Sequence, residues 1–413
     1  MNKQRIALLA SRIIIMLSSL GIVWMNTYFL GLEGQGEAGL ISFGILIVAT
    51  VSMFITGGNI VYFTPRMQHG ETIRVAWIWN TLSAVLVGLV LMAIPIFPKA
   101  FILHIILLGW LQGIFTYHMQ LLLARLHLLA YAATLIVQSG TSFFVLFYFY
   151  HFVPNPDIGH FQSALYASFF ITMLVSGIMV KNEYRSGTLP PWKSTFKSLW
   201  NYGKWGQTGN IFHLFNQRVN LSLLNNLLFQ GKASAGLFSI AMYGAEVIWM
   251  VAKSISTEQY ALIANSEDAD HQIDMTRKNL RLAVIIGLMA SVGILLVPET
   301  IYLFIVHSAT DALALKETLM WLIPGILANS GAIILAHYFS GIGKPEHNAI
   351  ASAAGFALGL PVAILLIPTD GIIGAAVATS LAFLTQTGYF LYHWNKLVIA
   401  NRKDRLRRAH GQP

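Results

Sequence analysis

The sequence predicts an all-α membrane protein that crosses the bilayer about twelve times. Of its 413 residues, 56% are hydrophobic and only 10% are charged, a composition outside the range that keeps globular domains soluble. Apolar runs of roughly 20 residues, the length that spans a bilayer, recur along the whole chain with brief polar interruptions. The Lys and Arg residues concentrate in every second loop, which is the pattern that sets membrane topology.

Each predicted span is an apolar run bounded by polar loop residues. In the first half of the chain the spans are residues 6–30, 38–63, 73–97, 101–124, 128–153 and 161–180. In the second half they are residues 204–228, 235–262, 281–305, 317–339, 348–367 and 371–394. Pro95, Pro298, Pro324 and Pro361 fall inside or at the ends of spans. We expect helix kinks there, because proline removes a backbone hydrogen bond.

The distribution of basic residues tests this map, because cytoplasmic loops carry the excess of Lys and Arg. Of the 26 Lys and Arg residues, Lys99, Lys232 and Lys316 fall outside, Arg218 and Lys253 fall within spans, and the other 21 fall on the cytoplasmic side. A wrong number of spans before the middle would scramble this alternation. The count supports twelve spans with both termini in the cytoplasm.

The longest predicted interior loops are residues 181–203 and 263–280, and neither could hold a catalytic domain. The first contains Pro190 and Pro191 among several basic residues, which is typical of a linker. We therefore expect an N-terminal six-helix bundle at 1–180, a cytoplasmic linker at 181–203, a C-terminal six-helix bundle at 204–395 and a basic cytoplasmic tail at 396–413.

An internal repeat supports this division into halves. Residues 34–42 (GQGEAGLIS) join the first two predicted spans, and residues 231–239 (GKASAGLFS) join the seventh and eighth. The offset is 197 residues and five of the nine positions are identical. Because six spans separate the copies, both halves enter the membrane in the same orientation, which predicts parallel repeats related by an axis along the membrane normal.

The formal net charge of +9 would suggest a nucleic-acid partner in a soluble protein. In a membrane protein the basic loops instead set topology and meet anionic lipid head groups, so we expect membrane lipids and no nucleic acid as partners. The absence of cysteine excludes disulfides and cysteine metal sites. The basic start at 1–12 runs into apolar sequence without a small-residue cleavage site, which favours an uncleaved first helix.

The seventh span is unusually polar. At 100° per residue, Asn210, His213, Gln217 and Asn220 share one arc of the helix, and Gln207, Arg218 and Asn225 flank it. A helix facing lipid would not tolerate such a surface. The span is therefore predicted to face protein or a water-filled space.

Arg218, Glu246 and Lys253 are the charged residues that we expect to cluster. Arg218 lies about 21 Å into its span from Lys204, and Glu246 lies about 16 Å from the outer end of the next span, so their depths nearly coincide. Lys253 shares a helix face with Glu246, seven residues away. Two interpretations remain open: an ion pair that only joins helices, or part of a water-filled pathway.

Polar residues are fewer in the first six spans. Arg12 could extend to the cytoplasmic rim or face the interior, and Asn26, Asn59 and Asn80 lie within spans one to three. His118 in the fourth span is interpreted as a helix-packing residue, with titration during transport as the alternative.

Features typical of enzymes are absent from the sequence. It contains no phosphate-binding Gly-rich loop followed by Lys and Ser or Thr, and no HExxH zinc motif. The outside-facing acids Asp157, Asp311 and Asp370 lie in short loops and are interpreted as turn formers. We therefore expect no catalysis, no cofactor and no metal. A purely structural scaffold would leave the polar spans unexplained.

Four segments carry a resemblance to a known family: residues 30–36 (LGLEGQG), 57–63 (GGNIVYF), 341–345 (GIGKP) and 371–379 (GIIGAAVAT). With them the sequence resembles the Wzx-type flippases, which translocate lipid-linked repeat units of O-antigen or exopolysaccharide. Those flippases group with the multidrug and toxic compound extrusion (MATE) transporters and the lipid II flippase. The resemblance covers nearly the whole chain, although each segment consists of residues common in membrane proteins.

The resemblance implies a MATE-like fold, with two six-helix bundles around a central cavity lined mainly by spans one, two, seven and eight. It implies a place in the bacterial cytoplasmic (inner) membrane. The substrate and partner would be a lipid-linked oligosaccharide, and enzymes of polysaccharide synthesis are candidate partners.

The resemblance also assigns roles to individual residues. Arg218 and Lys253, with Arg12 behind them, would bind the pyrophosphate of the substrate, because a guanidinium offers several donors to phosphate oxygens. The amides expected to bind sugar hydroxyls are those of Asn26, Asn59, Gln217 and Asn220. Glu246 would neutralise Arg218 or bind a coupling proton.

The function expected from the sequence is therefore translocation of a polyprenyl-pyrophosphate-linked oligosaccharide by alternating access. The first alternative is a cation-coupled multidrug antiporter of the same fold, for which Glu246 and Glu258 are the available acids. The second is a membrane oligosaccharide polymerase or ligase. That activity would require an outside-facing catalytic cluster, which the short outer loops do not offer.

Overall fold

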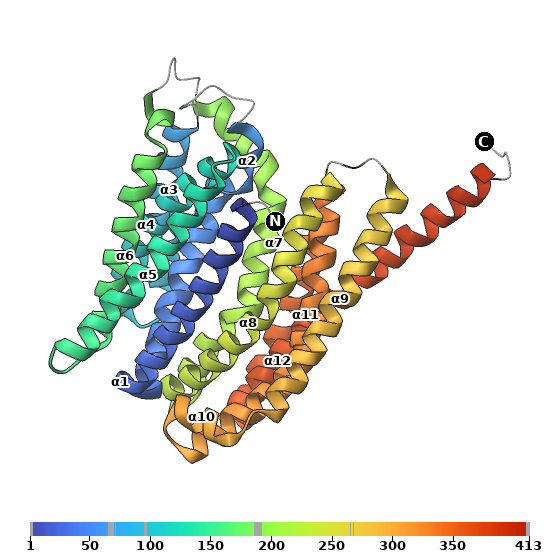
Figure 1. Ribbon diagram of the computed structural model, residues 1–413. Coiled ribbons are helices and arrows are strands. Elements are labelled where there is room, and N and C mark those ends of the chain that lie inside the picture. Colours follow the sequence, from blue (N-terminus) through green and yellow to red (C-terminus); the bar gives the residue numbers. More distant parts are fainter. Residues whose placement is uncertain are drawn as a thin grey trace. The chain divides into compact units, whose positions relative to one another are not determined.

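The computed structural model describes residues 3–64, 70, 72–94, 97–185, 192–264, 266 and 268–409, and these residues are almost entirely helical (Figure 1). The chain forms two compact units. Unit 1 consists of Met1–Gln207 and Phe229–Ser239, and unit 2 consists of Thr208–Leu228 and Ile240–Pro413. The chain therefore passes from one unit to the other three times, after residues 207, 228 and 239.

The helices before the middle of the chain belong to unit 1. They are α1 (Lys3–Thr56), α2 (Gly58–Phe63), α3 (Ile73–Ala93), α4 (Lys99–Ala124), α5 (Leu128–Phe152), α6 (Ile158–Met179) and the 3-10 helix η2 (Lys181–Arg185). α1 comprises two helices joined at Gly31, whose φ of 68° lies in the left-handed region that glycine adopts without strain. The kink separates the first two predicted spans. α1 packs against α3, α4 and α5.

The remaining helices are α7 (Trp192–Leu227), α8 (Gly231–Ala264), α9 (Ala269–Leu296), α10 (Glu299–Val306), α11 (Ala309–Gly341) and α12 (Glu346–Ala409). α12 again comprises two helices, which meet at Gly371 with a φ of 57°. In unit 2, α11 packs against α9, α10 and α12.

The predicted all-helical membrane fold is confirmed. When α1 and α12 are each divided at their kinks, the described residues contain twelve long helical segments in the predicted order. Nine of the described helices are long and apolar enough to cross a membrane. α7, which contains the predicted seventh span, is not among the nine because its sequence is polar.

Several helix boundaries differ from the predicted ones. Pro298 separates α9 from the short helix α10, so the span predicted at 281–305 is interrupted by the proline. α7 begins at Trp192, inside the segment expected to be a linker, and α12 continues into the expected tail. α9 begins at Ala269, because the carboxylate of Asp268 accepts hydrogen bonds from two backbone N–H groups of its first turn.

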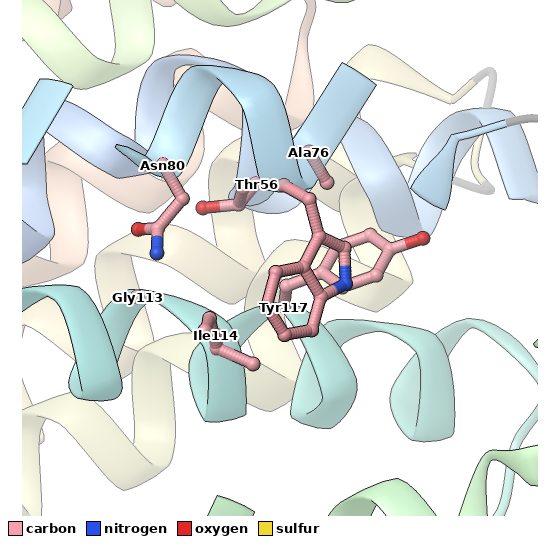
Figure 2. A pocket seen from close by; sticks show the side chains of 7 residues that line it. Thr56, Ala76, Asn80, Gly113, Ile114 and Tyr117 are labelled. Carbon is pink, nitrogen blue, oxygen red and sulfur yellow. The ribbon is translucent and has the colours of Figure 1, made fainter. Parts of the chain in front are cut away.

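A polar contact joins α1, α3 and α4 inside unit 1. Asn80 Oδ1 accepts a hydrogen bond from Ser52 Oγ at 2.6 Å, and Asn80 Nδ2 donates to the Trp110 carbonyl at 2.9 Å. Figure 2 shows Asn80 directed at Gly113, where a β-carbon would collide with its amide oxygen. The hollow beside these residues has no room for a water molecule. Asn80 is therefore a helix-packing residue.

The two turns of the internal repeat meet in unit 1. A β-carbon on Gly36 would collide with the Lys232 carbonyl oxygen, and one on Gly236 would collide with the Leu32 carbonyl oxygen. Two side-chain contacts flank this crossing: Lys232 Nζ with Glu37 Oε1 at 2.6 Å, and Gln35 Nε2 with Ser239 Oγ at 3.2 Å. The facing glycines are 200 residues apart, three more than the repeat offset of 197. The turns are therefore displaced by about one helical turn from equivalent pairing.

Candidate functional site

The buried guanidinium of Arg218 on α7 is the centre of the candidate site in unit 2. The residue as a whole is 4% exposed, and Nη2 donates to Glu246 Oε1 on α8 at 2.5 Å. The guanidinium carbon lies 4.8 Å from the ring centroid of Tyr243, also on α8. In the described part of the chain, Arg218 Nε and Nη1 are buried and have no hydrogen-bond partner. Two charged donors therefore remain available to an anionic ligand.

Glu246 is the accessible member of this pair, since its side chain is 26% exposed whereas that of Arg218 is 5% exposed. A carboxylate in that position balances the arginine charge when no ligand is bound. Sequence reasoning missed Tyr243. Its spacing of three residues from Glu246 places both on one face of α8, and that spacing would have identified it.

Lys253 lies on α8, and its predicted place in one cluster with Arg218 stays a prediction. It follows Glu246 by seven residues, about 10 Å along the helix axis. Its charge acts on the imidazoles of His213 on α7 and His337 on α11. The structure thus brings Arg218 and Glu246 together and places Lys253 in a neighbouring polar group.

Gln217 belongs to the polar face of α7 as the sequence predicts. Its side-chain nitrogen lies 3.1 Å from His213 Nε2, and Gln217 is 9% exposed. Among the described residues, His213 Nδ1 is buried without a partner. Gln217 and His213 therefore join the group around Lys253.

Asn220 lies on the side of α7 that packs against α12. Its Nδ2 donates to the Ala375 carbonyl at 3.1 Å and to Thr379 Oγ1 at 2.7 Å. Asn216 likewise donates to the Ser352 carbonyl at 3.0 Å. Both amides use their donors to hold α12. The role of Asn220 in substrate binding stays a prediction.

Asn26 and Asn59 lie in unit 1 and also bond to neighbouring helices. Asn26 Oδ1 accepts from Tyr150 Oη on α5 at 2.8 Å. Asn59 Nδ2 donates to the Phe54 and Leu199 carbonyls, and its Oδ1 accepts from the Ile60 backbone N–H. This geometry does not test the sugar-binding roles of Asn26 and Asn59, which stay predictions.

Arg12 is half-buried on α1, and its charge acts on Tyr131 of α5. Within the part of the chain that the structure describes, no carboxylate forms an ion pair with Arg12. Arg125 differs, because its guanidinium makes a two-pronged contact with Glu183 at 2.8 and 3.1 Å. Arg12 is thus a candidate for an external anion.

His118 packs helices together, as the sequence suggested. Its Nδ1 lies 2.9 Å from Ser176 Oγ, and its Nε2 lies 2.7 Å from Tyr184 Oη. Partial burial raises the pKa of the Tyr184 hydroxyl, so this group stays protonated at neutral pH and can donate to the imidazole. Among the described residues, no group of three or more His, Asp or Glu side chains could hold a metal ion.

Comparisons with known proteins place this geometry in context. No protein-family model matches the sequence. A probable low-salt glycan biosynthesis flippase of Haloferax volcanii, Agl15, is 22% identical over 245 residues, which cover 57% of this chain and 51% of that protein. An uncharacterized membrane protein of Bacillus subtilis, YabM, is 28% identical over 211 residues, 48% of this chain and 38% of that protein. The chain spans about half the length, or less, of the curated relatives it matches.

Solved structures match over nearly the entire chain. An inward-facing multidrug resistance MATE family transporter of the MOP superfamily superposes with a TM-score of 0.70 at 13% identity, covering 94% of this chain and 96% of that one. The lipid II flippase MurJ in an inward closed conformation also has a TM-score of 0.70, at 14% identity, covering 94% and 87%. The chain has the fold of these transporters. It is a multi-pass membrane protein whose structural neighbours are transporters and flippases.

Three charged side chains, those of Arg218, Glu246 and Lys253, belong to the polar groups on α7 and α8 in the described part of unit 2. Arg218 and Glu246 balance each other.

Proposed function

We propose that this chain is a flippase that translocates a polyprenyl-pyrophosphate-linked oligosaccharide, such as an O-antigen or exopolysaccharide repeat unit, across the cytoplasmic membrane. The observation that carries the proposal is the buried guanidinium of Arg218, two of whose donor nitrogens have no partner among the described residues. A diphosphate presents several charged oxygens to such donors.

In this proposal, transport depends on an exchange at Arg218, in which the pyrophosphate of the substrate replaces the carboxylate of Glu246. Glu246 holds one guanidinium nitrogen of Arg218. When a pyrophosphate enters, its oxygens bind Nε and Nη1, and the Lys253 ammonium attracts the same anion. The partly exposed carboxylate of Glu246 then turns away. Alternating access releases the head group on the other side of the membrane.

Two comparisons support the anionic glycolipid as the substrate class. The relative in Haloferax volcanii is named a probable glycan biosynthesis flippase, and the structural neighbour MurJ is named a lipid II flippase. The proposal places the protein in the bacterial inner membrane with both termini in the cytoplasm, where the basic loops meet anionic lipids. Enzymes of polysaccharide synthesis are the proposed partners, since they supply the substrate on that side.

A cation-coupled multidrug antiporter is the second candidate, because a MATE transporter superposes as well as MurJ does. A cationic drug would require an uncompensated acid in the polar interior. Glu246 is already paired with Arg218, and Glu258 is exposed. The charge balance around Arg218 therefore favours the flippase.

The identity of the lipids that accumulate without the protein tests the proposal. The gene is deleted from its host and restored as the wild type, as Arg218→Ala or as Arg277→Ala. Arg277 is an exposed arginine paired with Asp274 and provides the matched loss of one positive charge. We expect polyprenyl-pyrophosphate glycans to accumulate in the deletion strain and with Arg218→Ala at normal membrane abundance, but not with Arg277→Ala. Accumulation of cationic drugs in the deletion strain, with no such glycolipid, would replace the flippase by the antiporter.

A further inference from the structure

A cavity of about 250 Å³, lined by both polar and apolar side chains, lies in unit 1 between α1, α5 and α6. Its polar lining consists of Ser18, Ser19, Gln138, Ser139, Ser142 and Ser168, and no ionisable side chain lines it. The volume is that of about eight water molecules. Such a space is large enough for one sugar ring and too small for an oligosaccharide.

The cavity lies at the middle of all three helices that form it. Ser18 and Ser19 are central in the first predicted span (6–30), Ser139 and Ser142 in α5 (Leu128–Phe152), and Ser168 in α6 (Ile158–Met179). Five serines gathered at the centre of a bilayer require an explanation, because hydroxyls without partners there are costly.

Packing explains only part of this lining. Ser139 Oγ donates to the Leu135 carbonyl and Ser168 Oγ donates to the Gln138 carbonyl. Ser18, Ser19 and Ser142 have no partner in the part of the chain that the structure describes. Three hydroxyls therefore remain for a ligand that is neutral and carries hydroxyl groups itself. Most of the exposed lining surface is apolar and suits the C–H face of a sugar; it comes from Ile15, Ile22, Leu135, Leu165 and Phe169.

Arg12 lies at the cytoplasmic side of the same cavity. It precedes the lining residue Ile15 by one helical turn, and Tyr131, on which its charge acts, precedes the lining residue Leu135 by one turn. Along α1, Arg12 is about 9 to 10 Å from Ser18 and Ser19. The long arginine side chain can span most of that separation, so its guanidinium can reach a phosphate that lies a few ångström from a sugar in the cavity.

We propose that this cavity is a sugar subsite, in which the serine hydroxyls bind the first sugar of a lipid-linked glycan while Arg12 binds the adjoining phosphate, at a stage of transport different from the one in which Arg218 binds it. The inference rests on the proposed function and names a contact region for the substrate within unit 1. The other occupants to be tested are the prenyl chain of the lipid and water alone.

The natural absence of cysteine makes a site-specific test direct. Single-cysteine variants Ser139→Cys, in the cavity, and Ser163→Cys, on the exposed side of α6, are reconstituted in nanodiscs. Each is treated with 2-hydroxyethyl methanethiosulfonate, a neutral reagent whose approach Arg12 does not steer. The protecting probes are farnesyl-pyrophosphoryl-N-acetylglucosamine and farnesyl pyrophosphate, which differ in the sugar and in the extra negative charge of the free terminal phosphate.

We expect the sugar-bearing probe to slow labelling of Ser139→Cys about tenfold at concentrations where farnesyl pyrophosphate has no effect. Labelling of Ser163→Cys stays unchanged, and adding Arg12→Gln removes the protection of Ser139→Cys. Equal protection by both probes would assign the cavity to the prenyl chain and overturn the inference. Absence of protection, or an unreactive Ser139→Cys without probe, would overturn it as well.

The lipid analysis of the deletion strain keeps the two proposals separate. Glycolipid accumulation without protection at Ser139→Cys removes only the sugar subsite. Absence of glycolipid accumulation removes the flippase itself.

Discussion

Gly36 and Gly236 cross backbone to backbone in unit 1, and neither position has room for a β-carbon. The atoms in the way are the carbonyl oxygens of Lys232 and Leu32, which belong to the main chain and cannot rotate aside. The crossing therefore depends on two glycines from segments 200 residues apart. The internal repeat supplies the close approach that holds the α7–α8 turn against α1.

Gly36→Ala is expected to destabilise the protein by about 1–3 kcal/mol, as overpacking does when the obstructing atoms are rigid. Gly293→Ala is the control, because that α9 glycine has open space where a β-carbon would stand. It should leave the melting temperature unchanged or raise it, since alanine favours a helix. Thermal unfolding in detergent measures the melting temperatures of purified Gly36→Ala and Gly293→Ala. Equal melting temperatures for Gly36→Ala and the wild type would show that the crossing is not tight.

The Arg218–Glu246 pair is expected to show strong coupling. Glu246→Gln leaves a buried guanidinium without its counter-ion, and breaking a buried pair in this way costs about 3–5 kcal/mol. The double variant Arg218→Gln/Glu246→Gln removes both charges and should be more stable than Glu246→Gln alone. A double-mutant cycle on melting temperatures checks this. A loss of stability in the double variant equal to the sum of the losses in Arg218→Gln and Glu246→Gln would show that the contact at 2.5 Å does not contribute to stability.

The double variant also separates stability from transport. It should accumulate in the membrane like the wild type and still fail to export glycans, because the anion-binding donors are gone. Normal export by a strain carrying only Arg218→Gln/Glu246→Gln would exclude both residues from the substrate path.

Asn220→Ala is expected to reduce membrane abundance more than transport per molecule. Its amide donors hold α12 through Ala375 and Thr379, and the loss of a buried hydrogen-bond partner costs about 1–3 kcal/mol. Gln217→Ala should show the opposite profile, with normal abundance and slower export. Quantitative immunoblotting combined with an export assay distinguishes the two. Equal abundance and reduced export for Asn220→Ala would restore its predicted role as a substrate ligand.

Gly113→Ala is expected to disturb the α1–α3–α4 contact by displacing the Asn80 side chain, which bonds to Ser52 and Trp110. A loss of about 1–3 kcal/mol follows if those bonds are broken and their partners stay buried. Gly177→Ala is the control, because a β-carbon there meets His118 only at an ordinary contact distance of 3.6 Å. Melting temperatures in the same detergent compare the two. A Gly113→Ala protein as stable as Gly177→Ala would contradict the packing role assigned to Asn80.

The order of the helices follows from local sequence. Hydropathy and the alternation of basic loops locate the spans without any tertiary information, and the kinks at Gly31 and Gly371 separate spans that the apolar runs already distinguish. The helical start of α7 at Trp192 was missed, since basic and proline residues there are typical of a linker. α10 was missed because the apolar run continues across Pro298.

The site was less accessible to sequence reasoning, because hydrogen-bond partners lie far apart in the chain. The polar face of α7 was predicted, but whether a side chain faces a ligand or another helix depends on residues such as Thr379, 159 positions from Asn220. Asn26 is likewise engaged by Tyr150, 124 positions away. The cavity between α1, α5 and α6 was not predicted, because single serines are common in membrane helices. Only their assembly across the three helices is informative.

Direct translocation is the measurement closest to the central claim. The purified protein is reconstituted in vesicles with a fluorescent polyprenyl-pyrophosphate oligosaccharide, and lectin or enzyme added outside reports how fast the glycan crosses. Wild type and Arg277→Gln are expected to move the glycolipid at equal rates, and Arg218→Gln at least about tenfold more slowly. Translocation by Arg218→Gln at the wild-type rate, or none by the wild type beyond protein-free vesicles, would contradict the account.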